Sequence, residues 1–149
     1  MGDLLQPWHL IVLFFFFSIF CLVPAIFYML TLQNALNKCA PASRTIEPGM
    51  VWLLLIPLFN LVWNFFVVIG IANSLANEYV RRGRPSPEPS PGKSVGIAMS
   101  VCACCGVIPI LGVLAGLAYL VLWVIYWVKI SEYNRSLEVL PVAFPPPAI

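Results

Sequence analysis

Sulfur-bearing side chains are the densest group in this sequence that could do chemistry. Cys102, Cys104 and Cys105 occur in the run SVCACCG, and Met99 stands three residues before Cys102. On a helix, Met99, Cys102 and Cys105 share one face, and thioether and thiolate ligands suit Cu(I). Specific metal sites usually combine paired Cys-x-x-Cys clusters or histidines, whereas His9 is the single histidine here. Because cysteine is also a small buried hydrophobe, we predict no metal and keep soft-metal binding at these three residues as an alternative.

Ionisable groups suited to catalysis are few and scattered. An enzyme that moves protons needs a side chain able to donate or accept one at the reacting atoms. The sequence has no Ser–His–Asp grouping, no HExxH motif and no phosphate-binding loop. Its acidic residues are spread along the chain: Asp3, Glu47, Glu78, Glu88, Glu132 and Glu138. We therefore predict a protein that is not an enzyme and binds no cofactor.

Polar residues inside an apolar tract are a third candidate. The stretch PLFNLVWN places Pro57, Asn60 and Asn64 in the run MVWLLLIPLFNLVWNFFVVIGI. On a helix these residues and Leu53 line one face, and Pro57 removes the backbone donor for the carbonyl of Leu53. Because lipid offers no hydrogen bonds, this seam is expected to face protein.

The composition determines which elements must position these residues. The chain has 149 residues, of which 61% are hydrophobic and 9% charged. Residues 8–30, 50–71 and 95–128 contain no Asp, Glu, Lys or Arg. Uncharged apolar runs of this length are typical of membrane spans. We predict an integral membrane protein whose first span is retained, because the N-terminal region carries Asp3 and lacks the basic residues of a signal peptide.

The third apolar tract is too long for one span, and its middle contains Gly106, Pro109 and Gly112. A turn at Pro109 gives an all-α four-helix bundle with spans at about 8–30, 50–71, 92–108 and 110–130, the last two forming a tight hairpin. Four spans place six basic residues on one side and Lys38 and Arg44 on the other, so the positive-inside rule predicts that both termini are cytoplasmic. Residues 1–140 then form one domain with a disordered inside loop at 83–93, followed by a Pro-rich tail at 141–149.

In this arrangement each span carries a polar group near the membrane centre. We expect a hydrogen-bonded layer that joins the helices or, as an alternative, lines a pathway for a small solute. Small residues at Gly96, Gly112 and Gly116 allow helices to approach closely, within the hairpin or between copies of the chain. The residues of the layer are Ser18, Asn60, Asn64, Ser100 and Tyr119.

Two blocks of the sequence resemble a group of small bacterial inner-membrane proteins of unknown function. The runs are PGMVWLLLIPLFNLVWNFFVV with ANSLANEYVRRG, and IPILGVLAGLAYLVLWVIYWVKISEYN. They are similar to the PLFNLxW and IPILGxLAG…YWVKI blocks of that group and cover about two thirds of the chain, from 33 to 134. The resemblance implies a bacterial origin and a four-helix fold, but it implies no activity.

Three functional hypotheses follow. The first is a non-enzymatic protein of the bacterial inner membrane that acts through helix contacts, as a homo-oligomer or as an accessory or scaffold subunit. Its partners would be the lipid bilayer and itself or another membrane protein, and no nucleic acid. The second is a small pore or transporter subunit that uses the Asn60 and Asn64 seam. The third is copper handling by Met99, Cys102 and Cys105.

Overall fold

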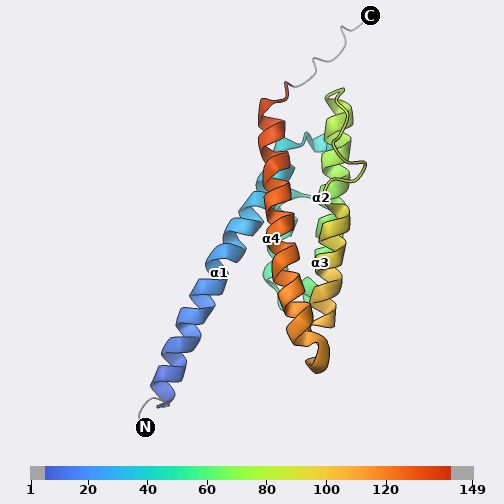
Figure 1. Ribbon diagram of the computed structural model, residues 1–149. Coiled ribbons are helices and arrows are strands. Elements are labelled where there is room, and N and C mark those ends of the chain that lie inside the picture. Colours follow the sequence, from blue (N-terminus) through green and yellow to red (C-terminus); the bar gives the residue numbers. More distant parts are fainter. Residues whose placement is uncertain (1–5, 142–149) are drawn as a thin grey trace, which may run out of the picture.

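A computed structural model describes residues 6–141, and within them the chain is helical throughout, with no β-strand (Figure 1). The all-α prediction is confirmed. Apart from its first residue, the predicted tail 141–149 lies outside the described residues. The elements are α1 (Pro7–Lys38), the 3-10 helices η2 (Pro41–Ser43) and η3 (Pro48–Leu55), α2 (Phe59–Arg81), α3 (Lys93–Cys105) and α4 (Pro109–Val139).

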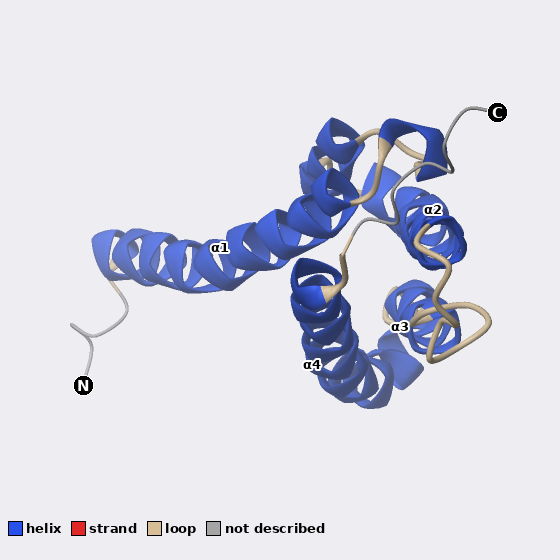
Figure 2. Ribbon diagram, turned by 90° about the horizontal axis from the view of Figure 1, so that it is seen from above, coloured by secondary structure: helices blue, strands red, loops and turns tan. Residues whose placement is uncertain are grey.

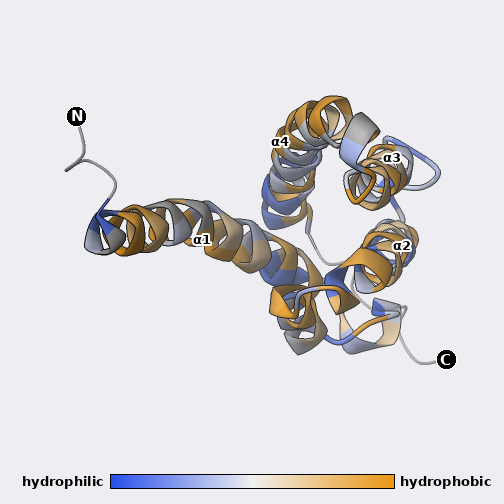
Figure 3. Cartoon of the chain, turned by 90° about the horizontal axis from the view of Figure 1, so that it is seen from below, coloured by the Kyte–Doolittle hydropathy of each residue, from blue (hydrophilic) through white to orange (hydrophobic). Residues whose placement is uncertain are grey.

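Three of these helices are long and apolar enough to cross a membrane: Trp8–Lys38, Phe59–Arg81 and Leu111–Val139. The most apolar stretch of α1 is not buried in the fold at all. Figure 2 shows the first half of α1 pointing away from the other helices, and Figure 3 shows that this half is largely hydrophobic. A surface of this kind is compatible with a lipid environment, and the three apolar helices are compatible with a membrane protein.

The break predicted in the third apolar tract lies where Pro109 stands. α3 ends at Cys105, residues 106–108 form a turn, and Pro109 is the first residue of α4. The turn is closed by hydrogen bonds from Gly106 N to Cys102 O (2.9 Å) and from Ile108 N to Cys105 O (3.1 Å). Proline is well tolerated at this helical position because its missing N–H would have no partner there. The two helices pack against each other along the hairpin (Figure 1).

The predicted span 50–71 is not one helix. Its first part belongs to η3, and the chain then turns at residues 56–58 before α2 begins. Side chains of α2 pair with the preceding segment in reverse order: Asn77 Nδ2 donates to Ser43 O (3.3 Å), and Trp63 Nε1 donates to Met50 O (2.9 Å). Residues 43–55 therefore run antiparallel to α2. η3 and α2 therefore form a helical hairpin with its turn at residues 56–58, so the end of α2 lies at the same end of the bundle as the start of this segment.

A strained turn forms the tip of this η3–α2 unit. Pro57 has no N–H to continue η3, so the carbonyl of Leu54 loses the donor that a further 3-10 turn would supply. Leu58 then adopts φ 64° and ψ −48°, and Phe59 N donates to Pro57 O (2.7 Å). This geometry is that of the rare form of γ-turn, with the positive φ that L-residues avoid. The predicted helical face through Leu53 and Pro57 is therefore wrong, and only its continuation from Asn60 onward lies on a helix.

We expect Leu58→Gly to raise the free energy of unfolding by about 1 kcal/mol, because glycine adopts positive φ without the steric cost borne by leucine. Little burial is lost, since Leu58 is 82% exposed. Denaturation in detergent measures the change. Leu58→Ala is the control: it keeps the Cβ and the strain, and is not expected to stabilise. Equal effects of the two variants would show that the turn is unstrained.

All eight basic residues belong to the half of the bundle in which α1, α2 and α4 end (Figure 1). Lys38 Nζ donates to Glu138 Oε1 (2.5 Å) and to Asn134 O (3.1 Å), and Arg82 Nη2 donates to Lys38 O (3.2 Å). The predicted separation of Lys38 and Arg44 from the other basic residues is therefore wrong. It assumed that residues 50–71 cross the membrane, whereas the η3–α2 unit turns back. The start of α1 and the end of α4 lie at opposite ends of the bundle, which does not fit the four-span arrangement with both termini on one side.

The loop predicted to be disordered at 83–93 ends one residue earlier, where α3 begins, and it is tied to the bundle. Glu88 forms an ion pair with Lys129 of α4, and Gly92 N donates to Glu88 Oε2 (3.1 Å). Pro91 is fully buried. The hydrogen bond from Lys129 is the main cause that lowers the pKa of the Glu88 carboxyl. The Pro/Ser composition predicted disorder because the loop has few apolar residues. The ion pair with Lys129 is a tertiary contact, and the composition of the loop does not indicate it.

The three glycines predicted to allow close helix packing differ in whether another part of the fold lies against them. A Cβ on Gly96 would lie 2.4 Å from Val68 Cγ1 and 2.9 Å from Tyr126 Cε2, so Gly96 lets α3 contact both α2 and α4. A Cβ on Gly112 would lie 2.9 Å from Gly106 O in the hairpin turn. At Gly116, in contrast, no heavy atom of the described residues lies within 4 Å of such a Cβ. The hairpin therefore uses Gly112 and leaves Gly116 free.

Candidate functional site

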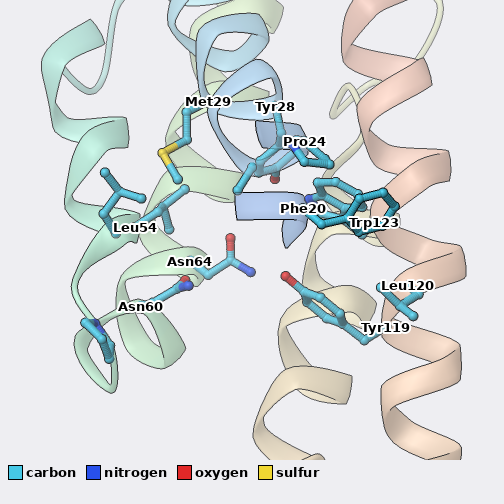
Figure 4. A pocket seen from close by; sticks show the side chains of 13 residues that line it. Phe20, Pro24, Tyr28, Met29, Leu54, Asn60, Asn64, Tyr119, Leu120 and Trp123 are labelled. Atoms are coloured by element: carbon cyan, nitrogen blue, oxygen red, sulfur yellow. The ribbon is translucent and has the colours of Figure 1, made fainter. Parts of the chain in front are cut away.

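A pocket of about 510 Å³ lies between α1, the tip of the η3–α2 unit, and α4 (Figure 4). The α1 wall includes Phe20, Pro24 and Tyr28, and the α4 wall includes Tyr119 and Trp123. The volume falls within the range of small-molecule sites in proteins. The remaining lining residues are mostly apolar: Ala25, Met29, Leu54, Leu55, Pro57, Asn60, Asn64 and Leu120.

Three of the five predicted layer residues line this pocket. Asn60 and Asn64 lie on α2, and Figure 4 shows the Asn64 amide and the Tyr119 hydroxyl directed toward one another across the space. The predicted hydrogen-bonded layer does not form. Ser100 Oγ donates to Gly96 O of its own helix (2.9 Å), and Ser18 is half-exposed on α1 and is not a lining residue.

Polar groups at the pocket lack partners among the described residues. Asn64 is 5% exposed, and neither its amide nor the Tyr119 hydroxyl makes a hydrogen bond in the described part of the chain. The buried hydroxyl of Tyr28, at the edge of the pocket, is also without a partner there. Unpaired polar groups that line a cavity are available to hydrogen-bond a ligand in it.

Two prolines at the pocket leave backbone carbonyls without their regular helical donors. Pro24 lies inside α1 and cannot donate to the carbonyl of Phe20, one helical turn earlier and on the same face. Pro57 likewise leaves Leu54 O without its next 3-10 donor. All four residues line the pocket. Sequence reasoning missed this pairing of two prolines, because the prolines are 33 positions apart (24 to 57) and only the fold brings them to one cavity.

Beyond the pocket, the face of α2 that carries Asn60 and Asn64 is packed in the core. Val67 and Ile71 continue the face of Asn60 and Asn64 toward the basic end, and both are fully buried. Ser74 and Glu78 complete the face, so its predicted burial from Asn64 onward is confirmed. On α2 the lining of the pocket ends at Asn64, and the next residues of this face are packed in the core.

A buried ionic cluster lies at the basic end of the same α2 face. The Glu78 side chain is fully buried, and its carboxylate accepts hydrogen bonds from Arg81 Nη2 (2.6 Å), Arg82 Nε (2.8 Å) and Ala40 N (3.0 Å). Buried carboxylates require such compensation, because removing a charge from water costs several kcal/mol. In the sequence Glu78 is one of several scattered acidic residues, and its position alone did not indicate this cluster.

Arg82 connects the cluster to two other helix ends. Its guanidinium donates to Leu137 O (2.7 Å), Leu140 O (2.8 Å) and Lys38 O (3.2 Å). These carbonyls belong to the last turns of α4 and α1, whose final carbonyls have no intrahelical donors. A cation at these positions also interacts favourably with the helix dipoles. The arrangement is structural: it fixes three chain segments to each other.

The sulfur residues do not assemble into a metal centre in the described part of the chain, where no three His, Cys, Asp or Glu side chains form a cluster. Met99 is buried, and Cys102 and Cys105 are partly buried. The Cys104 thiol faces the carbonyl of Leu61 on α2 at 4.0 Å. A copper site at Met99, Cys102 and Cys105 would need ligands from outside this helix.

Cys39 is expected to resist alkylation in the folded protein. It is 1% exposed, and burial, with a contribution from the Glu78 charge, raises the pKa of its thiol to about 12. Since the thiolate is the nucleophile, a maleimide should label a variant that retains only Cys39 in SDS but not in mild detergent. A cysteine introduced at exposed Ala42 provides the reference. Equal labelling rates at both positions in mild detergent would contradict the packing of this region.

Comparisons with known proteins found no similarity: no family model, no curated protein and no solved structure matches this chain. The resemblance seen in the sequence blocks therefore stays a prediction.

Proposed function

We propose that this chain is a non-enzymatic protein of the bacterial inner membrane that works through lateral helix contacts, as a homo-oligomer or an accessory subunit of a larger complex. The observation that carries the proposal is the free surface at Gly116. Gly112 and Gly116 are four residues apart on α4, a spacing that lets transmembrane helices approach closely. The fold uses Gly112 in the hairpin turn but places nothing against Gly116.

We also propose an orientation, with the basic end in the cytoplasm. The positive-inside rule favours it because eight Lys and Arg residues lie toward this end, and no described Lys or Arg lies at the other. In this orientation α1 crosses once with its start outside. The η3–α2 unit enters from the cytoplasmic side and returns to it, and the α3–α4 hairpin does the same. Irregular backbone at membrane depth is tolerated where it is buried in protein or lines a cavity, which fits the turn at Leu58.

The contact proposal is tested by Gly116→Leu. A Cβ at residue 116 would meet no described atom within 4 Å, so the fold should tolerate the larger side chain, whereas a second helix packed at Gly116 would be displaced. Cross-linking in vesicles should show loss of self-association, or loss of a co-purifying subunit. Ala118→Leu is the matched control, because residue 118 lies exposed on roughly the opposite side of α4. Unchanged association in Gly116→Leu, or a chain that is always alone, would overturn the proposal.

A further inference from the structure

We propose that the pocket between α1, the η3–α2 tip and α4 binds a neutral glyceride-like lipid, a molecule with a hydroxyl and ester carbonyls at an uncharged head and hydrocarbon tails. This binding site is independent of association through Gly116. The inference starts from unpaired donors. The Asn64 amide and the Tyr119 hydroxyl face one another across the pocket without partners in the described part of the chain (Figure 4). Both can donate to carbonyl oxygens.

The amide oxygens of Asn60 and Asn64 are acceptors at the same pocket, so the ligand is expected to carry a donor as well. The carbonyls of Phe20 and Leu54 lose their usual helical donors to Pro24 and Pro57, respectively. Asn60 adds a further amide on the same side as Asn64. A free hydroxyl is the simplest group that serves such acceptors while adding no charge. A lipid head with one hydroxyl and neighbouring carbonyls therefore provides partners for both the donors and the acceptors of the pocket.

The electrostatics exclude a charged head. The lining residues include no Asp, Glu, Lys, Arg or His among those described. A phosphate or carboxylate placed here would have no counter-ion, and burying an unpaired charge is far more costly than burying a hydrogen-bonded neutral group. The ionic cluster at Glu78 does not reach the pocket, because the fully buried Val67 and Ile71 lie between them on α2.

The rim of the pocket explains how such a molecule would enter. Phe20, Leu55 and Leu120 line the pocket and are also 69%, 45% and 54% exposed, so the opening is apolar. In the proposed orientation these residues face the bilayer, and a lipid can enter sideways while its tails stay in hydrocarbon.

Photoactivatable lipids with identical tails test the proposal. The full chain in vesicles is exposed to diacylglycerol, phosphatidylglycerol or a fatty acid methyl ester probe. We expect diacylglycerol to label residues of the pocket at least about fivefold more than the other two. Tyr119→Phe and Asn64→Leu should each reduce this labelling about fivefold, the value of one neutral hydrogen bond.

Ser100→Ala is the control variant, because that buried hydroxyl bonds to its own helix and does not line the pocket. Its labelling should equal that of the unmodified chain. Size-exclusion profiles identify any variant that fails to fold. If Asn64→Leu fails to fold, Tyr119→Phe still tests the proposal, because it removes only a hydroxyl. Equal labelling by all three probes, preference for the anionic lipid, or no effect of Tyr119→Phe in the folded protein would overturn the proposal.

Discussion

Glu78→Gln is expected to lower the free energy of unfolding by about 3–5 kcal/mol, the range found when one member of a buried ion pair is removed. The amide keeps the size of the carboxylate but not its charge. Arg82, which is 8% exposed, would then be buried without its counter-ion, and Arg81 would lose its partner. Because Arg82 also holds the ends of α1 and α4, the loss should affect all three chain segments together.

Denaturation in mixed micelles measures this change. Glu138→Gln is the matched control, since it removes the same type of charge from the ion pair with Lys38, where Glu138 is 62% exposed. Exposed ion pairs contribute about 0–1 kcal/mol, so the control should change little. If both variants lost the same amount, the Glu78 cluster would have no special role in the fold.

Gly96→Ala is expected to cost about 2–3 kcal/mol, because the added methyl group overpacks a filled core. It would lie 2.4 and 2.8 Å from the two γ-carbons of Val68 and 2.9 Å from Tyr126 Cε2. Val68 is β-branched with one strongly preferred helical rotamer, and both neighbours are fully buried, so neither side chain can move aside easily. We expect α3 to separate from α2 and α4.

The same denaturation measurement, with proteolysis of the loop before α3 as a second readout, tests this expectation. Gly49→Ala is the control, since a Cβ at Gly49 meets nothing within 4 Å among the described residues. It should leave stability nearly unchanged. A Gly96→Ala protein as stable and protease-resistant as the control would mean that the close packing around Gly96 does not occur.

Local signals in the sequence were sufficient for several features. The apolar tracts gave the helical class, and Pro109 between two glycines gave the turn that separates α3 from α4. The spacing of Asn64, Ile71 and Glu78 gave the buried face of α2. In each case the determining interaction is close in sequence, either a proline with its own helix or residues one or two turns apart.

The η3–α2 unit could not be predicted in the same way. A tract that enters a membrane and returns has the same apolar composition as one that crosses it, and Pro57 without flanking glycines is compatible with a kinked span. The predicted topology was affected as well. Assigning the basic residues to alternate sides assumes that every apolar tract crosses the membrane. The pairing of residues 43–55 with α2, which would have decided the matter, is a tertiary contact.

The candidate site was predicted in part. Asn60, Asn64 and Tyr119 are conspicuous as polar groups in apolar tracts, and the fold brings them to one pocket. Ser18 and Ser100 looked equivalent in the sequence, but Ser100 satisfies its hydroxyl with its own helix. Tyr28 was not singled out, because a tyrosine near the end of an apolar tract is typical of an interfacial residue.

The membrane topology is tested by the sidedness of the two loops that join α1 to η3 and α2 to α3. Single cysteines replace exposed Ala42 and exposed Pro89, in a chain with the reactive native cysteines changed to alanine. A membrane-impermeant thiol reagent is then applied to intact bacterial cells and to permeabilised ones. We predict that both positions are protected in intact cells and labelled after permeabilisation, because both loops lie toward the basic end. Labelling of Ala42→Cys in intact cells with protection of Pro89→Cys would show that residues 50–71 cross the membrane, and would contradict the fold described above.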